Sequence, residues 1–309
     1  MKKFWKATLI PGVICILAGL VLSAILTFGF HEELLEHADE FSINEDNFFE
    51  YFDNDRFVSV TRSGNRYDKS ETKESYHFTA EQGETITGIN FEIAVGEVDI
   101  RTGDTMEVVV TDMFENAISS YVEDGVWYIT DSLIGSGSVH SEYSPEITIT
   151  MPENLALEDM TIYLAAGLMN AENLVAKDIQ LEVDAGSLKV FYLMADNSLK
   201  IKNGVGEVKI YDAKVNNLTI EEGIGAIDVT GVVTGHNMIK GGIGEVKLTL
   251  ADRNRVDFNY KVTCGIGEAE IGNMRFNGNT ENFSYDRGKA DYFELDCGIG
   301  HIEIDVNGN

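Results

Sequence analysis

A short repeated motif constrains the fold of this chain more than any other feature of its sequence. Copies such as GVGEVKI from Gly204 and GIGEVKL from Gly242 recur through the second half of the 309 residues. The third residue of each copy is a glycine, at Gly96, Gly167, Gly186, Gly206, Gly225, Gly244, Gly267 and Gly300. Over the middle of the chain these glycines lie 19 or 20 residues apart. Such a fixed period is typical of proteins built as a stack of similar units.

Each copy alternates apolar and polar residues, which is the pattern of a β-strand with one buried face. The residues two and four positions after each glycine are apolar, as Val208 and Ile210 are after Gly206. Those five and seven positions before it are also apolar, except at Asn237. Each unit therefore supplies two short strands that meet at a glycine corner. The sequence predicts an all-β fold, a parallel β-solenoid whose rungs of about 19–20 residues each contain one pair of strands.

The sequence also predicts which residues serve the corners of this stack. Glycine can adopt a positive φ and lets neighbouring backbones approach, so the repeated glycines are expected to be structural residues. Cys264 and Cys297 occupy the same position of their repeats. If those two rungs are neighbours, with the extra residues between them looped out, their thiols stack, either joined as a disulfide or as an unbonded pair.

Charged residues occupy the outward positions of the repeats. The column three residues after the corner glycines contains Lys189, Lys209, Asp228, Lys247, Glu270 and Glu303. From Lys209 to Glu270 the sign alternates from rung to rung, which favours correct register, and a solvated charged face is the alternative interpretation. The column one residue after the glycines contains Glu97, Glu207, Glu245 and Glu268, interrupted by Ala226. This spacing favours a solvated ladder over a catalytic acid/base pair.

An uncharged segment near the N-terminus predicts a membrane anchor. Residues 7–30 contain no charged residue, and about 20 apolar residues are enough to cross the hydrocarbon core as a helix. Lys2, Lys3 and Lys6 precede the segment and acidic residues follow it. The positive-inside rule therefore predicts a single-pass protein of the cell membrane, with a cytoplasmic tip at residues 1–6 and an extracytoplasmic remainder. The alternative is a cleaved signal peptide.

The remaining segments differ in composition. Residues 31–75 are acidic and polar and predict a juxtamembrane stalk. Residues 76–159 hold an N-terminal β region and the first rung, and residues 160–309 hold the solenoid repeats. Strand-like runs in the N-terminal β region lie at 106–111, 126–130 and 146–151. The last repeat has no following cap, so its final strand is expected to present an unpaired edge that would permit end-to-end self-association.

The charge balance and the motifs that are missing limit the functions of the chain. Its 52 acidic and 23 basic residues give a net charge of −29, which disfavours nucleic acid and other polyanions as partners. The sequence contains no cysteine and histidine pattern with zinc spacing, no HExxH motif and no nucleophile elbow. It therefore predicts a protein that is not an enzyme and that needs no cofactor and no specific metal ion.

Three stretches of sequence carry a resemblance to a known family. They are MKKFWKATLIPGVICILAGL at the N-terminus, EITITMPENLALEDMTI before the main repeats, and the GxGEVxI units themselves. Together they resemble the bacterial "putative adhesin" family of β-strand-repeat proteins, a domain of unknown function. The resemblance covers nearly the whole chain and implies a membrane-anchored, external solenoid in a bacterium. Its motifs describe the fold and assign no binding residues.

These observations lead to two hypotheses of function. The first is a membrane-tethered, extracytoplasmic β-solenoid that acts as a non-catalytic binding or adhesion scaffold at the cell envelope, with an envelope protein or glycan as its partner. The alternative is an accessory or sensory component of an envelope-stress or regulatory system. Because the predicted cytoplasmic tip has only about six residues, such a sensor would act through membrane partners.

Overall fold

The computed structural model describes residues 73–79, 85–114, 117–134, 145–153, 155–251, 253–278 and 280–306. All of these residues belong to one compact unit, Asp55–Asn309. Their regular elements are all strands, so the described part of the chain is all-β. Within it, no helix is long and apolar enough to span a membrane. The predicted anchor at 7–30, the predicted tip and nearly all of the predicted stalk lie outside the described residues.

Fifteen strands form one continuous sheet in the described segments. In chain order they are β1 (Lys73–Thr79), β2 (Gly88–Gly103), β3 (Glu107–Phe114), β4 (Ile118–Glu123), β5 (Val126–Asp131), β6 (Glu146–Pro152), β7 (Asp159–Asn216), β8 (Leu218–Thr234), β9 (His236–Leu250), β10 (Asn259–Cys264), β11 (Glu268–Ile271), β12 (Met274–Asn277), β13 (Thr280–Tyr285), β14 (Tyr292–Cys297) and β15 (His301–Val306). The main path through the sheet runs β1-β3-β6-β2-β7-β8-β9-β14-β10-β13.

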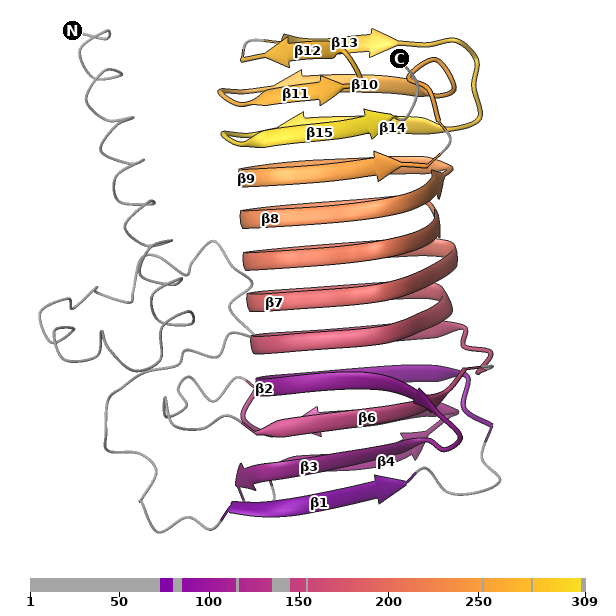
Figure 1. Ribbon diagram of the computed structural model, residues 1–309, viewed down its shortest axis with the longest axis vertical. Helices are drawn as coiled ribbons and strands as arrows, with labels where there is room; N and C mark the ends of the chain where they lie inside the picture. The colour runs from indigo at the N-terminus through magenta and orange to yellow at the C-terminus, as the bar shows by residue number, and fades with distance from the viewer. Residues whose placement is uncertain are drawn as a thin grey trace, which may run out of the picture. The chain divides into compact units, whose positions relative to one another are not determined.

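A regular stack of parallel rungs makes up the centre of this unit (Figure 1). β2, β7, β8 and β9 follow one another along the stack and pair in parallel. Their register places glycine on glycine, with Gly206 opposite Gly225 and Gly225 opposite Gly244. β7 is 58 residues long and continues through successive rungs, seen as its repeated bands in Figure 1. The observed fold is all-β, rich in parallel pairs and solenoid-like, which agrees with the predicted fold class.

Apolar side chains fill the interior of the stack. The positions two and four residues after the corner glycines are buried, as at Val208 and Ile210. The rungs of β7 also bury a further pair, seven and nine residues after the glycine: Leu174 and Ala176, Leu193 and Ala195, Ala213 and Val215. The prediction of one strand pair per rung missed this third inward-facing pair. Two exposed corner residues, such as Tyr211 and Asp212, interrupt the alternation and hide the continuation of the rung.

The last rungs do not follow the order of the sequence. β14 and β15 form one rung, which lies between β9 and the rung formed by β10 and β11 (Figure 1). β12 and β13 then pair antiparallel with β11 and β10 and cover their outer side. The expectation of an unpaired edge on the last strand is therefore wrong, because β15 has β9 on one side and β11 on the other. We call β14 and β15 the inserted rung.

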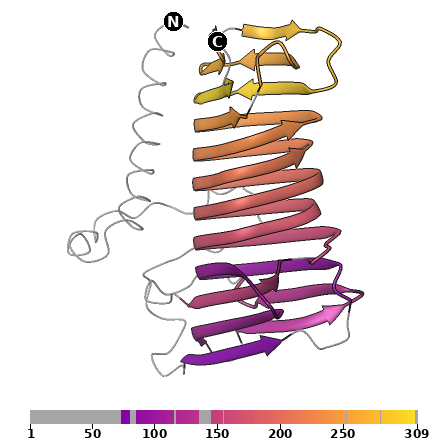
Figure 2. The same cartoon turned by 45° about the vertical axis from the view of Figure 1, so that its right-hand side comes forward.

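The opposite end of the stack is closed in a similar way. β5 and β6 together form one rung, which pairs in parallel with β2. β4 then pairs antiparallel with β5, β3 with β6 and β1 with β3. Figures 1 and 2 show these antiparallel strands at one end of the stack and β12 and β13 at the other. Both ends of the parallel stack thus finish in antiparallel strands.

Candidate interaction surfaces

Close backbone contact between rungs explains the glycine at each corner. From Gly96 to Gly244 the six corner glycines have φ between 138° and 153°, a region that residues with a side chain rarely adopt. Of the eight predicted glycines, the seven from Gly167 to Gly300 leave no room for a side chain. A Cβ added to any of them would lie 1.9–2.2 Å from a carbonyl oxygen of the neighbouring rung. These glycines therefore set the approach of the rungs and contribute no side chain to a binding site.

The charged column three residues after the corner glycines has a spatial order that differs from its sequence order. Glu303 of the inserted rung lies between Lys247 and Glu270. Its Oε2 lies 3.1 Å from Nζ of Lys247. The alternation expected from Lys209 to Glu270 therefore breaks at Glu270, which faces a like charge in Glu303. Arg275 of β12 offsets this repulsion, because its Nε lies 3.0 Å from Oε2 of Glu270.

The four glutamates predicted in the acidic column beside the glycines do not lie on neighbouring rungs. Ala226 lies between Glu207 and Glu245, and His301 lies between Glu245 and Glu268. At the other end of the column, Glu97 lies opposite Leu168 on β7 and opposite Glu146 on β6. At least one rung thus separates each predicted glutamate from the next, and the facing pair Glu97 and Glu146 is exposed to solvent. Among the described residues, no three His, Cys, Asp or Glu side chains are grouped as metal ligands would be.

Asp131 is a buried carboxylate at the point where the chain leaves the stack. Its oxygens accept the amide N–H groups of Ala94 (3.2 Å) and Leu133 (2.9 Å). At a regular corner a main-chain carbonyl of the neighbouring rung accepts the equivalent N–H, as the carbonyl of Cys297 accepts the N–H of Gly265. Burial raises the pKa of Asp131 to about 6, although these amides act in the opposite direction. β5 ends at Asp131, so the side chain of Asp131 supplies the hydrogen-bond acceptor that a main-chain carbonyl supplies at the regular corners.

Glu222 is a second buried carboxylate, and sequence reasoning missed it. It lies opposite Asn203 on one neighbouring rung and Gly241 on the other. Its Oε2 accepts the N–H of Gly242 at 2.9 Å, while its Oε1 and the Oδ1 of Asn203 have no hydrogen-bond partner among the described residues. Burial raises the pKa of Glu222 to about 7, against the effect of the Gly242 amide. Because the carboxylate is enclosed, it offers no accessible acid or base.

A signal for this interior polar group was present in the sequence. The column three residues before the corner glycines contains Ile93, Leu164, Val183, Asn203, Glu222, Gly241, Cys264 and Cys297. It changes from apolar to polar halfway along the stack, and the members with side chains are buried. The alternation of the flanking strands predicts an apolar interior and gives no indication of this polar column.

Cys264 and Cys297 lie opposite each other on β10 and β14. They are neighbours because the inserted rung lies beside β10. Both are buried and free, so the structure holds them as an unbonded pair. Burial raises the pKa of both thiols, to about 12 for Cys297. Since the thiolate is the reactive form, these cysteines suit packing better than thiol chemistry.

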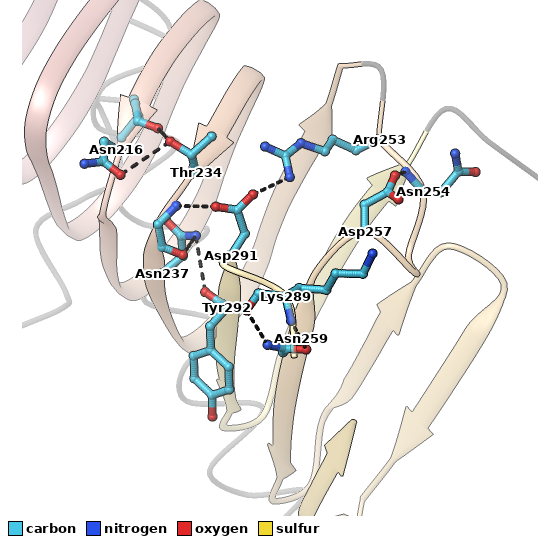
Figure 3. A network of polar contacts seen from close by, with 12 residues as sticks. Asn216, Thr234, Asn237, Arg253, Asn254, Asp257, Asn259, Lys289, Asp291 and Tyr292 are labelled. Carbon is cyan, nitrogen blue, oxygen red and sulfur yellow. Dashed lines mark hydrogen bonds and ion pairs between the residues drawn. The ribbon is translucent and has the colours of Figure 1, made fainter. Parts of the chain in front are cut away.

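A polar network holds the loops around the inserted rung (Figure 3). The carboxylate of Asp291, just before β14, accepts the N–H of Gly235 at 2.7 Å and pairs with Arg253, which belongs to the segment that bypasses the inserted rung. Asn259 fixes the other side of the loop, since its Nδ2 donates to the carbonyl of Lys289 at 2.9 Å. Two loops distant in sequence are thereby tied to one end of the stack.

Asn237, the exception in the apolar columns, bridges three rungs. Its Oδ1 accepts the N–H of Leu218 on β8 at 2.8 Å. Its Nδ2 donates to the carbonyl of Tyr292 on β14 at 3.3 Å (Figure 3). A second link on the outside joins Nζ of Lys261 to Oε1 of Glu294 at 2.8 Å. Polar side chains thus connect the inserted rung to both of its neighbours.

Three aromatic residues form a cluster on the outer surface of β7. Phe191 and Tyr211 hold the same repeat position on neighbouring rungs and are 55% and 50% exposed. Their ring centroids lie 5.5 Å apart, with 17° between the planes. Tyr192 lies beside Phe191, and Nζ of Lys214 is 5.3 Å from the centroid of its ring. Exposed aromatic side chains gathered in this way are typical of interaction sites, and sequence reasoning missed this aromatic cluster.

Several solved structures are similar to this chain at low sequence identity. A putative cell adhesion protein from Clostridium sporogenes is 18% identical and covers 76% of this chain and 100% of its own, with a TM-score of 0.37. A putative adhesin from Bacteroides fragilis is 14% identical over 76% of this chain and 98% of its own, with a TM-score of 0.38. A putative lipid binding protein from Parabacteroides distasonis is 12% identical over 78% and 99%, with a TM-score of 0.28.

The family of the chain follows from its own sequence. No protein with a curated description matches it. The sequence pattern of the Toastrack DUF4097 family matches residues 86–288, well over half of the chain. The match begins just before β2 and ends after β13, so it includes the regular stack and stops before the inserted rung. The resemblance to a β-repeat family of unknown function is thus confirmed, and the chain belongs to the Toastrack DUF4097 family.

Proposed function

We propose that this chain is a membrane-tethered, extracytoplasmic scaffold that binds partners at the bacterial cell envelope without catalysing a reaction. The tether is the uncharged segment at residues 7–30, preceded by three lysines. The observation that carries the binding role is the regular parallel stack from β2 to β9, with its glycine-on-glycine register. Stacks of this kind offer long, rigid faces on which partners can dock.

The distribution of polar groups supports binding over catalysis. The two carboxyl groups whose pKa values are raised toward neutrality, Asp131 and Glu222, are enclosed by the stack. Several outward charges pair with one another across rungs, as Lys202 does with Glu182 (2.8 Å) and Lys247 with Glu303 (3.1 Å). Catalysis would need an accessible group with a perturbed pKa in a cleft.

Two measurements on intact cells test this proposal. A reporter enzyme that is active only outside the cytoplasm, fused after residue 309, is expected to be active if the anchor has the proposed orientation. Deletion of the chain is expected to weaken attachment of the cells to isolated envelope material, with no change in the transcription of envelope genes. Changed transcription with unchanged attachment would favour a sensory accessory, and an inactive reporter would overturn the orientation.

A further inference from the structure

The aromatic cluster lies at a place where the rungs change length. Each rung has a second corner, five residues after its glycine. In the last rung of β7 this corner has two residues, Tyr211 and Asp212, whereas the corresponding corner of β8 has one, Thr230. The register shift between Ile210 and Ala213 records this difference. The rung after β8 keeps the one-residue corner. The β7 corner therefore projects beyond the β8 corner, and the surface forms a step with Tyr211 at its edge.

Among the described residues, Phe191 is the one ring that stacks on Tyr211, which leaves the other ring face open on this step. Phe191 stacks on Tyr211 from the preceding rung, so the opposite ring face is directed toward the shorter β8 corner. Thr230 occupies that corner, and Gly231 after it lies at an inward-facing position, opposite the buried Ala213 and Leu250. The floor of the step therefore carries one small side chain, that of Thr230.

Hydrogen-bonding groups surround this ring face. Asp212 is exposed next to Tyr211, and Thr230 contributes a hydroxyl group on the floor. A pyranose ring with equatorial hydroxyl groups combines an apolar face of C–H groups with a polar rim. It therefore matches an aromatic face that is bordered by carboxylate and hydroxyl groups.

We propose that the step at Tyr211 binds a sugar ring of a β-linked glycan, neutral or carrying amino sugars, stacked on the free face of the Tyr211 ring. This inference rests on the proposed function and names the ligand class of the scaffold. The net charge of −29, together with Asp212 beside the ring, disfavours an anionic glycan.

The extent of the aromatic cluster favours a sugar over a protein as its ligand. At the repeat position of Phe191 and Tyr211, the flanking rungs carry the polar residues Glu172 and Thr230. The exposed aromatic surface is therefore confined to two rungs. A stable protein interface buries about 800 Å² on each partner, with an apolar centre of several residues. One or two sugar rings need only one aromatic face and a few polar groups.

The experiment titrates the detergent-solubilised full chain with the β-1,4-linked tetramers of N-acetylglucosamine and of glucose, followed by calorimetry. For whichever tetramer the wild type binds, Tyr211→Ala is expected to lower the affinity about tenfold, because it removes the stacking face. Tyr211→Phe keeps that face and is expected to bind within about threefold of the wild type. The matched control is Tyr121→Ala, since Tyr121 is 48% exposed and stacks on Tyr128 at 5.0 Å. It is expected to leave binding unchanged.

The outcomes separate this inference from the proposed function. If the wild type binds neither tetramer at millimolar concentration, or if Tyr211→Ala binds as well as the wild type, the sugar site is overturned. The scaffold function stands in that case if the chain still supports attachment to envelope material. Attachment that is lost in Tyr211→Ala cells, with no affinity for either glycan, would identify a protein as the ligand of the step. If attachment persists in every variant and also in the deletion strain, the scaffold function itself is overturned.

Discussion

The regular stack and the C-terminal end of the sheet are built by different rules. From β2 to β9 each rung pairs with the next one in the sequence, and the corner glycines meet in register. At the C-terminal end the inserted rung enters between β9 and β10, so spatial order and sequence order differ. In the stack, backbone contact at the glycines sets the geometry. At the end, side chains such as Asn237 and Asp291 connect segments that are distant in sequence.

This difference shows what a repeat motif can specify. A repeated pattern produces rungs of one shape, and any rung can then pair with any other in parallel. The choice of neighbours needs information that differs from rung to rung. The acidic residues of the inserted rung supply some of it, because Glu303 pairs with Lys247 on one side and Glu294 pairs with Lys261 on the other. Such pairs select register and order, while apolar burial provides most of the stability.

The largest effect is expected from a corner glycine of the regular stack. Gly206→Ala would place a Cβ 1.9 Å from the carbonyl oxygen of Gly186, at a φ of 138°. We expect a loss of at least about 3 kcal/mol in the free energy of unfolding, measured with urea. The control is Gly288→Ala, at a φ of 67° with no atom within 4 Å of the added Cβ. It should lose about 1 kcal/mol. Equal losses would contradict the role of backbone contact.

The next effect concerns the polar network at the inserted rung. Asp291→Ala removes the acceptor of the Gly235 N–H and leaves Arg253 without its carboxylate partner. Since both charged side chains are at most 19% exposed, we expect a loss of about 2 kcal/mol, confined to the C-terminal end. Hydrogen exchange should speed up in β14 and remain slow in β8. Lys177→Ala, which breaks an ion pair whose side chains are 57% exposed, should change neither.

A smaller effect is expected from the carboxylate inside the regular stack. The pKa of Glu222 is raised from 4.5 to about 7, so the folded state keeps a proton that the unfolded state releases. Stability should therefore fall as pH rises from about 4.5 to about 7, and level off above that range. Glu222→Gln removes this dependence and should be more stable than the wild type by roughly 1–2 kcal/mol at pH 8, and similar to it at pH 4.5.

Urea unfolding across this pH range measures the Glu222 effect. Asp131, raised to about 6, contributes a slope of the same sign at lower pH, and Glu222→Gln should leave that part unchanged. Glu207→Gln, at an outward position of the preceding rung, serves as the matched control and should keep the wild-type dependence. A Glu222→Gln variant that loses stability at pH 8 would show that the carboxylate is ionised and needed.

The last prediction concerns the reactivity of the paired cysteines, with no change in stability expected. In a Cys15→Ser background, Cys264 and Cys297 are the remaining thiols. Both should react with a thiol reagent only after denaturation, because burial raises their pKa values and blocks access. Thiol counting in denaturant without reductant should return two. A count of zero would demonstrate the disulfide, and fast reaction of the native protein would contradict the burial of this pair.

The sequence-based predictions succeeded where the information was local. The glycine period and the columns of apolar residues predict parallel rungs with Val208 and Ile210 inside, and these residues are buried. They also predict that Cys264 and Cys297 are neighbours once the intervening residues loop out, and the structure places the two in register. The third inward-facing pair, Glu222 and the step at Tyr211 were missed. Each of them depends on how a corner resets the alternation, which a strict period of two does not reveal.

The amino-acid sequence by itself determined the repeating unit, because the alternation of side chains and the absence of a Cβ at the corners act within a single rung and its neighbour. Only the tertiary structure decided the order of the last rungs, the antiparallel closure of both ends and the step beside Tyr211. Rungs with the same apolar pattern are interchangeable as far as burial is concerned. Their order is therefore set by contacts between distant residues, such as Asp291 with Gly235, that exist only in the folded chain.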